Sequence, residues 1–158
     1  MKIKCDCSGA LKRAWPITNF DLSTYFGFSV QAERVKGWRC GRCGWETIPG
    51  ALVDELRHVV AAALLAQTSL LAADRARFLR KYLRYTQAES ASKMGVTRKT
   101  VNQWENRGTI SPQHDLTLRA LVFAQMPEAH RPSPEVLGSV RTSRRYVELK
   151  LPAIRRKR

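Results

Sequence analysis

Two close pairs of cysteines lie near the start of the chain and could together bind a metal ion. Thiolates are preferred ligands of zinc, and two short turns can deliver four of them to one tetrahedral ion. No histidine precedes His58, so these cysteines are the closed ligand set that this region offers. We therefore expect a structural Zn²⁺ ion. Its predicted ligands are Cys5, Cys7, Cys40 and Cys43.

Two other interpretations of the cysteines stay open. Redox-active thiols are expected in a strand–helix context, whereas the residues that follow Cys43 are typical of an extended segment. Ordinary buried cysteines would need no metal. A structural metal is favoured because paired cysteines in a reducing compartment are more often ligands than disulfides. A catalytic zinc would need an open position and an acid–base partner, and neither is apparent.

Short strands are expected to position the second cysteine pair. The apolar and aromatic character of residues 26–30 and 35–39 is typical of strands. A domain of residues 1–50 built from small hairpins buries little, and a bound metal would compensate for that. Its aromatic residues are expected to form a modest core and a partner-facing patch, with stacking on nucleic-acid bases as the alternative. They are Trp15, Tyr25, Phe26, Phe28, Trp38 and Trp45.

Residues 51–69 are expected to connect this domain to a second one. Their apolar residues recur at helical spacing, which predicts a helix that ends near Ala66. The helix could pack on the zinc ribbon or pair with another copy of itself, and both arrangements stay open. The most apolar stretch, residues 59–66, is far shorter than the roughly 20 residues of a membrane span.

Residues 70–126 carry the signals of several short helices. The first combines an apolar face with a basic face. Its basic residues are Arg75, Arg77, Arg80, Lys81 and Arg84. The last begins with Ser111 as its cap and Pro112 at the first helical position. Its expected apolar seam consists of Leu116, Ala120 and Leu121.

Between them the sequence predicts two further helices joined by a glycine turn. Thr86 and Glu89 have the spacing of a capping box, in which each side chain bonds the backbone N–H of the other residue. Gly95 suits the left-handed position that ends a helix. Thr97 would cap the next helix, which is expected to span residues 98–106.

In that last helix Val101 and Trp104 would face inward, which leaves long polar side chains outside. Asn and Gln can bind an adenine edge with two hydrogen bonds, and Arg or Lys can bind guanine. Threonines at helix starts could contact phosphate. A four-helix domain with a solvated polar face is the alternative. The predicted DNA-binding residues are Thr86, Gln87, Thr97, Arg98, Lys99, Thr100, Asn102, Gln103 and Arg107.

The string from Tyr85 to Glu105 resembles the XRE-type helix-turn-helix of phage repressors. Together with the cysteine pairs, the layout of roughly residues 3–125 resembles the MqsA (YgiT-type) family. In that family an N-terminal zinc domain is joined to a C-terminal XRE-type domain, and many members are antitoxins that bind a toxin and repress their own operon. The resemblance implies zinc ligation by the four cysteines, base reading by Lys99, Asn102 and Gln103, a homodimer and a cognate toxin.

Basic residues dominate the chain, with 28 Lys and Arg against 13 Asp and Glu and a net charge of +15. The excess lies in residues 1–50, 70–126 and the tail 127–158. An excess of this size predicts an anionic partner, and nucleic acid is the first candidate. The alternating residues 146–151 could form a strand. The arginine clusters on either side of it could contact DNA, or the tail could be a disordered, solubilising end.

The expected fold is α+β: a small four-cysteine zinc ribbon joined by a helix to an all-α domain of the XRE type. The expected function is sequence-specific repression through binding to double-stranded operator DNA as a homodimer. The alternative is an antitoxin whose zinc domain mainly neutralises a toxin, with autorepression secondary. No arrangement of nucleophile, carboxylate pair or phosphate loop suggests an enzyme. Without a signal peptide or membrane segment, a cytoplasmic location is expected.

Overall fold

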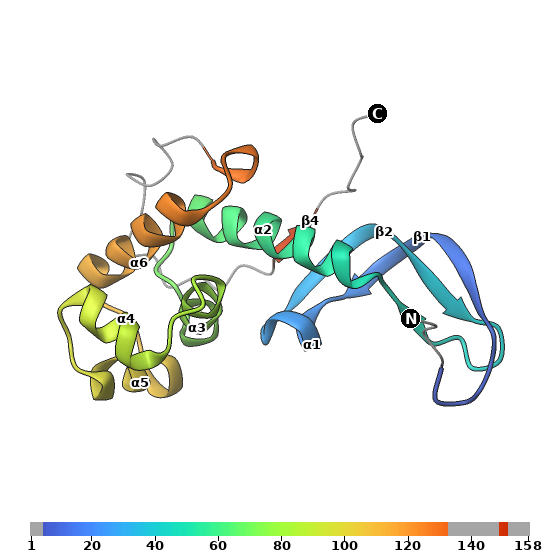
Figure 1. Cartoon of the computed structure of the whole chain (residues 1–158), viewed down its shortest axis with the longest axis horizontal. Helices are drawn as coiled ribbons and strands as arrows, with labels where there is room; N and C mark the ends of the chain where they lie inside the picture. Colours follow the sequence, from blue (N-terminus) through green and yellow to red (C-terminus); the bar gives the residue numbers. More distant parts are fainter. Residues whose placement is uncertain (1–4, 133–148, 152–158) are drawn as a thin grey trace.

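A computed structural model of the chain describes residues 5–132 and 149–151, with the backbone alone for Arg107 and for residues 149–151. The fold is α+β. A small sheet lies at one end of an elongated molecule and a group of helices at the other (Figure 1). Within the described part of the chain, no helix has the length and apolar character needed to cross a bilayer.

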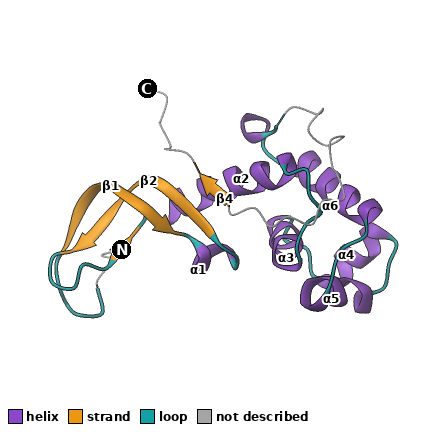
Figure 2. Cartoon of the chain, turned by 180° about the vertical axis from the view of Figure 1, so that it is seen from behind, coloured by secondary structure: helices purple, strands orange, loops and turns teal. Residues whose placement is uncertain are grey.

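The sheet is built on one long antiparallel hairpin. Strand β1 (Leu11–Asp21) pairs with strand β2 (Val30–Cys40), and the helical turn α1 (Ser23–Phe26) lies between them. Strand β3 (Glu46–Thr47) pairs antiparallel with the end of β2, and β4 (Leu149–Leu151) pairs parallel with its start. After the helices, β4 therefore joins the same sheet that β1, β2 and β3 form (Figure 2).

One of the two expected strands is wrong. Residues 35–39 lie in β2, as predicted, but Phe26 ends α1, and Gly27 follows in the left-handed conformation with φ of 82°. Of residues 26–30 only Val30 belongs to a strand. The aromatic rings of this segment serve packing instead, because Phe26 and Phe28 both meet Phe78 edge to face at centroid distances of 5.5 Å.

Five helices follow the sheet. Helix α2 runs from the sheet towards the others and lies beside both parts of the molecule (Figure 2). A short 3-10 turn, Glu128–His130, comes after the last of them. Their bounds are α2 Gly50–Ala66, α3 Ala73–Tyr82, α4 Gln87–Met94, α5 Arg98–Arg107 and α6 Pro112–Gln125.

The predicted helix boundaries are confirmed where polar caps mark them. Thr86 and Glu89 form both hydrogen bonds of a capping box at the start of α4. Gly95 ends α4 with φ of 66°, a left-handed conformation that costs glycine little. The hydroxyls of Thr97 and Ser111 accept hydrogen bonds from the backbone N–H groups of Thr100 and His114, in the first turns of α5 and α6.

Two expected helix faces differ in the structure. Arg75 and Arg80 on the basic face of α3 are buried, at 7% and 9% exposure. On α6 the predicted seam is wrong for Leu116 and Ala120, which are exposed. The buried side of α6 is marked instead by Leu118 and Val122 and by two charged residues that pair with each other. These are Asp115 and Arg119.

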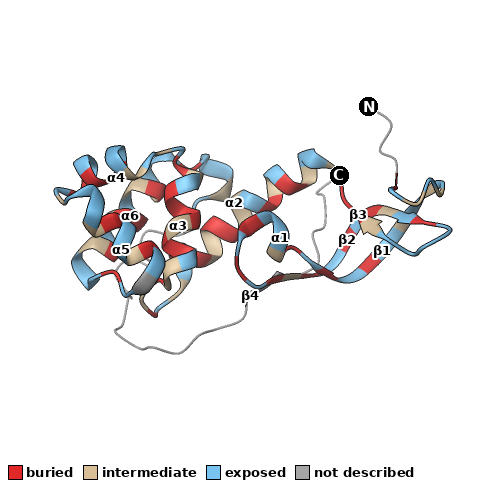
Figure 3. Cartoon of the chain, turned by 90° about the horizontal axis from the view of Figure 1, so that it is seen from below, coloured by how far each residue is buried: buried red, intermediate tan, exposed pale blue. Residues whose placement is uncertain are grey.

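The buried apolar side chains form one continuous core from the sheet into the helices (Figure 3). Ile17 and Val35 supply it from the hairpin, Leu56 and Val60 from α2, and Val122 from α6. Helix α2 therefore packs against both neighbouring parts of its own chain. The predicted strand at 146–151 is observed over 149–151, and the arginine clusters at 141–145 and 155–158 lie outside the described residues.

Candidate functional site

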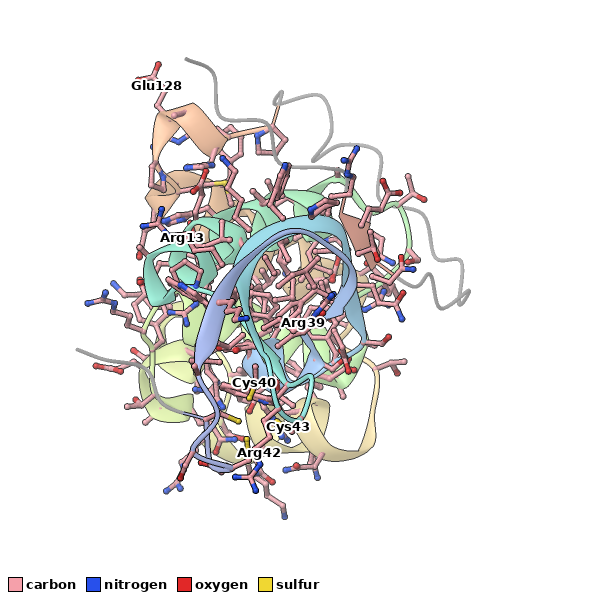
Figure 4. All side chains as sticks on the ribbon, turned by 90° about the vertical axis from the view of Figure 1, so that its right-hand side faces the viewer. Arg13, Arg39, Cys40, Arg42, Cys43 and Glu128 are labelled. Atoms are coloured by element: carbon pink, nitrogen blue, oxygen red, sulfur yellow. The ribbon has the colours of Figure 1, made fainter. Side chains whose placement is uncertain are left out.

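The four cysteines come together at the far end of the hairpin. Their sulfurs all lie within 4.8 Å of one another, and three neighbouring Sγ–Sγ pairs are 3.4 Å apart. Cys5 and Cys7 precede β1, Cys40 ends β2, and Cys43 lies in the turn that follows (Figure 4). This arrangement could hold one metal ion, as the spacing predicts.

Backbone N–H groups reinforce the cluster. Gly9 donates to Cys7 Sγ and Arg42 to Cys40 Sγ, each at 3.4 Å. The backbone N–H groups of Cys43 and Arg42 lower the pKa of the Cys40 thiol to about 6. Backbone hydrogen bonds lower the pKa of Cys5 and Cys7 as well, but hydrogen bonds with neighbouring thiols and burial outweigh them, which raises the pKa of Cys5 to about 12 and that of Cys7 above its usual value. A divalent cation binds thiolates, and it would stabilise the ionised sulfurs and relieve the repulsion among them.

Gly9 is a residue of this site that sequence reasoning missed. A Cβ atom there would lie 2.5 Å from Cys40 Sγ and 3.1 Å from Cys7 Sγ, inside the contact distances of real atoms. Glycine is therefore required at residue 9, where the turn after Cys7 passes close to the sulfur of Cys40. Its position two residues after Cys7 was the available signal, and it parallels the glycines beside Cys40 and Cys43.

A second candidate site is the outer face of α5. Val101 is buried, Trp104 is half-buried, and the buried Glu105 completes the inner face. The exposed residues recur at helical spacing and so share one side of the helix. They are Arg98, Lys99, Asn102, Gln103 and Asn106. The first four belong to the predicted DNA-binding set.

Glu105 fixes α5 to two other helices. Its carboxylate accepts hydrogen bonds from Arg80 Nε at 2.5 Å and Arg80 Nη2 at 2.9 Å, both from α3. It also accepts one from Gln87 Nε2 of α4 at 3.0 Å. Burial raises the pKa of Glu105, but the hydrogen bonds from Arg80 and Gln87 outweigh it and hold that pKa below its usual value. The orientation of the exposed row thus depends on an ionised carboxylate that sequence reasoning did not single out.

The remaining predicted DNA-binding residues have mixed surroundings. Gln87 is half-buried, with its amide committed to Glu105. Thr86 is exposed at the start of α4. Thr97 and Thr100 bond each other through their hydroxyls at 2.8 Å. Arg107 is the last residue of α5, and its side chain lies outside the described part of the structure.

Asn106 extends the exposed row and was also missed. Its Oδ1 accepts a hydrogen bond from Arg77 Nη2 at 2.6 Å, while its Nδ2 donates to the backbone oxygen of Asn102 at 3.0 Å. Arg77 thus lies at the edge of the same surface. Its place on the basic face of α3 was the signal, but only the fold brings α3 beside the end of α5.

No family model matches the chain, and comparisons with curated proteins and with solved structures likewise give no match. The two candidate sites are therefore interpreted from their own residues.

Proposed function

We propose that this protein is a sequence-specific DNA-binding repressor that reads operator DNA with α5, as a helix of the XRE helix-turn-helix type. The observation that carries the proposal is the exposed row on α5, held in place by the buried pair of Arg80 and Glu105. Lys99, Asn102 and Gln103 have the donors and acceptors that base edges require in the major groove.

Neighbouring groups suit the DNA backbone. The N-terminus of α5, capped by Thr97, carries the partial positive charge that favours phosphate. Arg98 adds a full charge beside it, and Thr86 offers a hydroxyl at the start of α4. Contacts to the DNA phosphates would position the protein, and contacts to the base edges would select the sequence.

A homodimer completes the proposal. Two copies related by two-fold symmetry would read two half-sites about 10 base pairs apart or a multiple of that distance. The four cysteines would bind Zn²⁺ for a structural purpose, since a cluster at the open end of a thin hairpin, opposite its α1 turn, has little apolar core of its own to rigidify it.

Fluorescence anisotropy of the zinc-loaded full chain tests the proposal. The probe is duplex DNA from upstream of the protein's own gene, the control is a scrambled duplex of equal length, and both are titrated across a salt series. We expect tighter binding to the native sequence by about 10³-fold or more. Equal affinities with the same steep salt dependence would contradict base reading. They would point instead to charge alone and to a protein partner, such as the toxin that the family resemblance implies.

A further inference from the structure

A groove lies between the hairpin and the start of α2. Its volume is about 250 Å³. Trp15, Arg34 and Lys36 line it from the hairpin, and Pro49, Leu52 and Glu55 line it from the other side. The groove is remote in sequence from α5, and the proposed reading of operator DNA makes no use of it.

Trp15 is the aromatic residue among those that line the groove. Its side chain is 52% exposed although it lies in the middle of β1. The Arg34 guanidinium carbon lies 5.8 Å from the indole centroid and Lys36 Nζ lies 5.3 Å from it. Among the described residues neither cation forms an ion pair. An anion bound to them would therefore lie directly beside an open aromatic ring.

We propose that this groove binds an unpaired nucleotide of single-stranded nucleic acid. The base would stack on Trp15 and contact Leu52, while its phosphate would pair with Arg34 and Lys36. A half-exposed aromatic ring with two cations close over it combines the stacking surface and the charge that single strands require, because every base has a π-face and every nucleotide a charge. Glu55, at the α2 side, would repel phosphate and so favours placing the base edge there.

The surroundings favour a nucleic acid over a protein partner. In the described part of the chain four large apolar residues are exposed, and each lies on a different segment of the fold. They are Trp15, Tyr25, Trp45 and Leu116. Stable protein interfaces usually need a contiguous apolar centre. A duplex fits less well because its bases are already stacked and paired.

The test uses anisotropy of the zinc-loaded full chain with labelled oligothymidine and, in a second arm, oligouridine of equal length. We expect both to bind. Trp15→Ala should weaken single-strand binding by about 5- to 100-fold, and Trp15→Phe should retain most of it. Trp45→Ala, which removes an exposed tryptophan outside the groove, is the matched control and should change nothing.

The two cations are tested by the salt dependence of binding. The double variant Arg34→Gln, Lys36→Gln should reduce the slope of log K against log salt by about 0.7, because both side chains contact one phosphate and each phosphate neutralised on a single strand contributes about 0.7. Different affinities for the two oligonucleotides would show whether DNA or RNA is preferred. The proposal would be overturned if neither oligonucleotide bound at low salt. It would also be overturned if wild type and Trp15→Ala bound with equal affinity while their melting temperatures were the same.

A failure here would leave the proposed repressor function intact. That function depends on α5 and on duplex DNA, and Trp15→Ala should leave the affinity for the native duplex within about twofold. Conversely, Lys99→Ala should weaken duplex binding without changing the affinity for oligothymidine. The two proposals therefore fail separately in the same assay.

Discussion

The guanidinium of Arg119, on α6, donates a hydrogen bond from Nη1 to the backbone oxygen of Leu64, on α2, at 2.7 Å. The same side chain also donates to the backbone oxygens of Gln67 and Ser69 and forms an ion pair with Asp115. It is fully buried. One arginine therefore satisfies the free carbonyls at the end of α2 and joins that helix to α6.

Replacing Arg119 with Met should be strongly destabilising. The substitution keeps much of the volume but leaves the buried Asp115, whose pKa burial already raises, without its cation, and the carbonyls of Leu64 and Ser69 without their donor. Removing one partner of a buried ion pair costs about 3–5 kcal/mol. Urea unfolding should show a loss of this size. Arg57→Met, at an exposed pair, is the control and should change the free energy of unfolding by less than about 1 kcal/mol.

Glu105→Gln should lower both stability and duplex affinity. The variant keeps the shape of the side chain but removes the charge that faces Arg80 inside the protein. We expect a loss of about 3 kcal/mol in the free energy of unfolding and weaker binding to duplex DNA at temperatures where the variant is folded. Glu33→Gln removes an exposed carboxylate and is the matched control. A stability equal to wild type would show that Glu105 does not anchor α5.

Gly9→Ala should impair metal binding. The added Cβ would press on Cys40 Sγ and Cys7 Sγ, so the sulfurs would have to move apart. Zinc affinity, measured by competition with a chromophoric chelator, should fall by about 10- to 100-fold, as for other changes that displace metal ligands. Gly41→Ala is the matched control because a Cβ there meets nothing closer than 3.8 Å. Equal affinities for the two variants would contradict the role assigned to Gly9.

Single alanine substitutions along α5 should reduce specific DNA binding. Lys99→Ala, Asn102→Ala and Gln103→Ala should each cost about 1–3 kcal/mol on the native duplex and much less on scrambled DNA. All three side chains are exposed, so the melting temperature should stay near that of wild type. Gln113→Ala, an exposed glutamine of α6, is the control. Equal losses on both duplexes would mean that these residues contact phosphate rather than bases.

The free energy of unfolding should decrease as the pH is lowered, because His58 takes up a proton more readily in the unfolded chain than in the folded protein. Nδ1 of His58 lies 2.7 Å from Tyr82 Oη, and its ring stacks on His130 at 4.9 Å. Burial, and then the charges of His130 and Arg57, lower the pKa of His58, while Asp54 opposes them. The unfolded chain therefore binds this proton first as pH falls.

The contribution of His58 to stability is thus present above about pH 6.5 and is lost as pH falls towards the lower pKa of the folded state. Melting temperatures at about pH 7.5 and about pH 5.5 should differ more for wild type than for His58→Phe, which cannot titrate. Protonation of the cysteines also lowers the stability of both proteins at low pH. The informative quantity is therefore the difference between the two proteins in how far the melting temperature falls. An equal decrease for both would contradict the prediction.

Local signals in the sequence were sufficient to predict the capped helix boundaries and the cysteine cluster. A capping box, a C-terminal glycine and a Ser-Pro start act within one turn, so Thr86, Gly95 and Ser111 reveal them without knowledge of the fold. The cysteine spacing predicted the cluster for a related reason, since four thiols in a small region can bind a metal ion in few alternative ways.

Features that depend on distant partners escaped prediction. Arg80 is a surface residue by type, and only Glu105, far along the chain, explains its burial. Strand β1 was missed because it lacks a clean alternation: its register shifts between Ala14 and Ile17, and Asn19 has a positive φ of 53°. The outer row of α5 was foreseen, whereas the carboxylate that orients it was not.

The parallel pairing of β4 with β2 has a consequence for biosynthesis. Val30 emerges from the ribosome long before its partner Leu149, because the helices and the residues that follow them are made in between. The edge of β2 must therefore remain without this partner while the residues between the two strands are synthesised. Contacts between residues so far apart in sequence form slowly because a long loop must close first. A nascent chain stalled before residue 149 would expose that edge to other strands, so the synthesis of β4 also removes a site for aggregation.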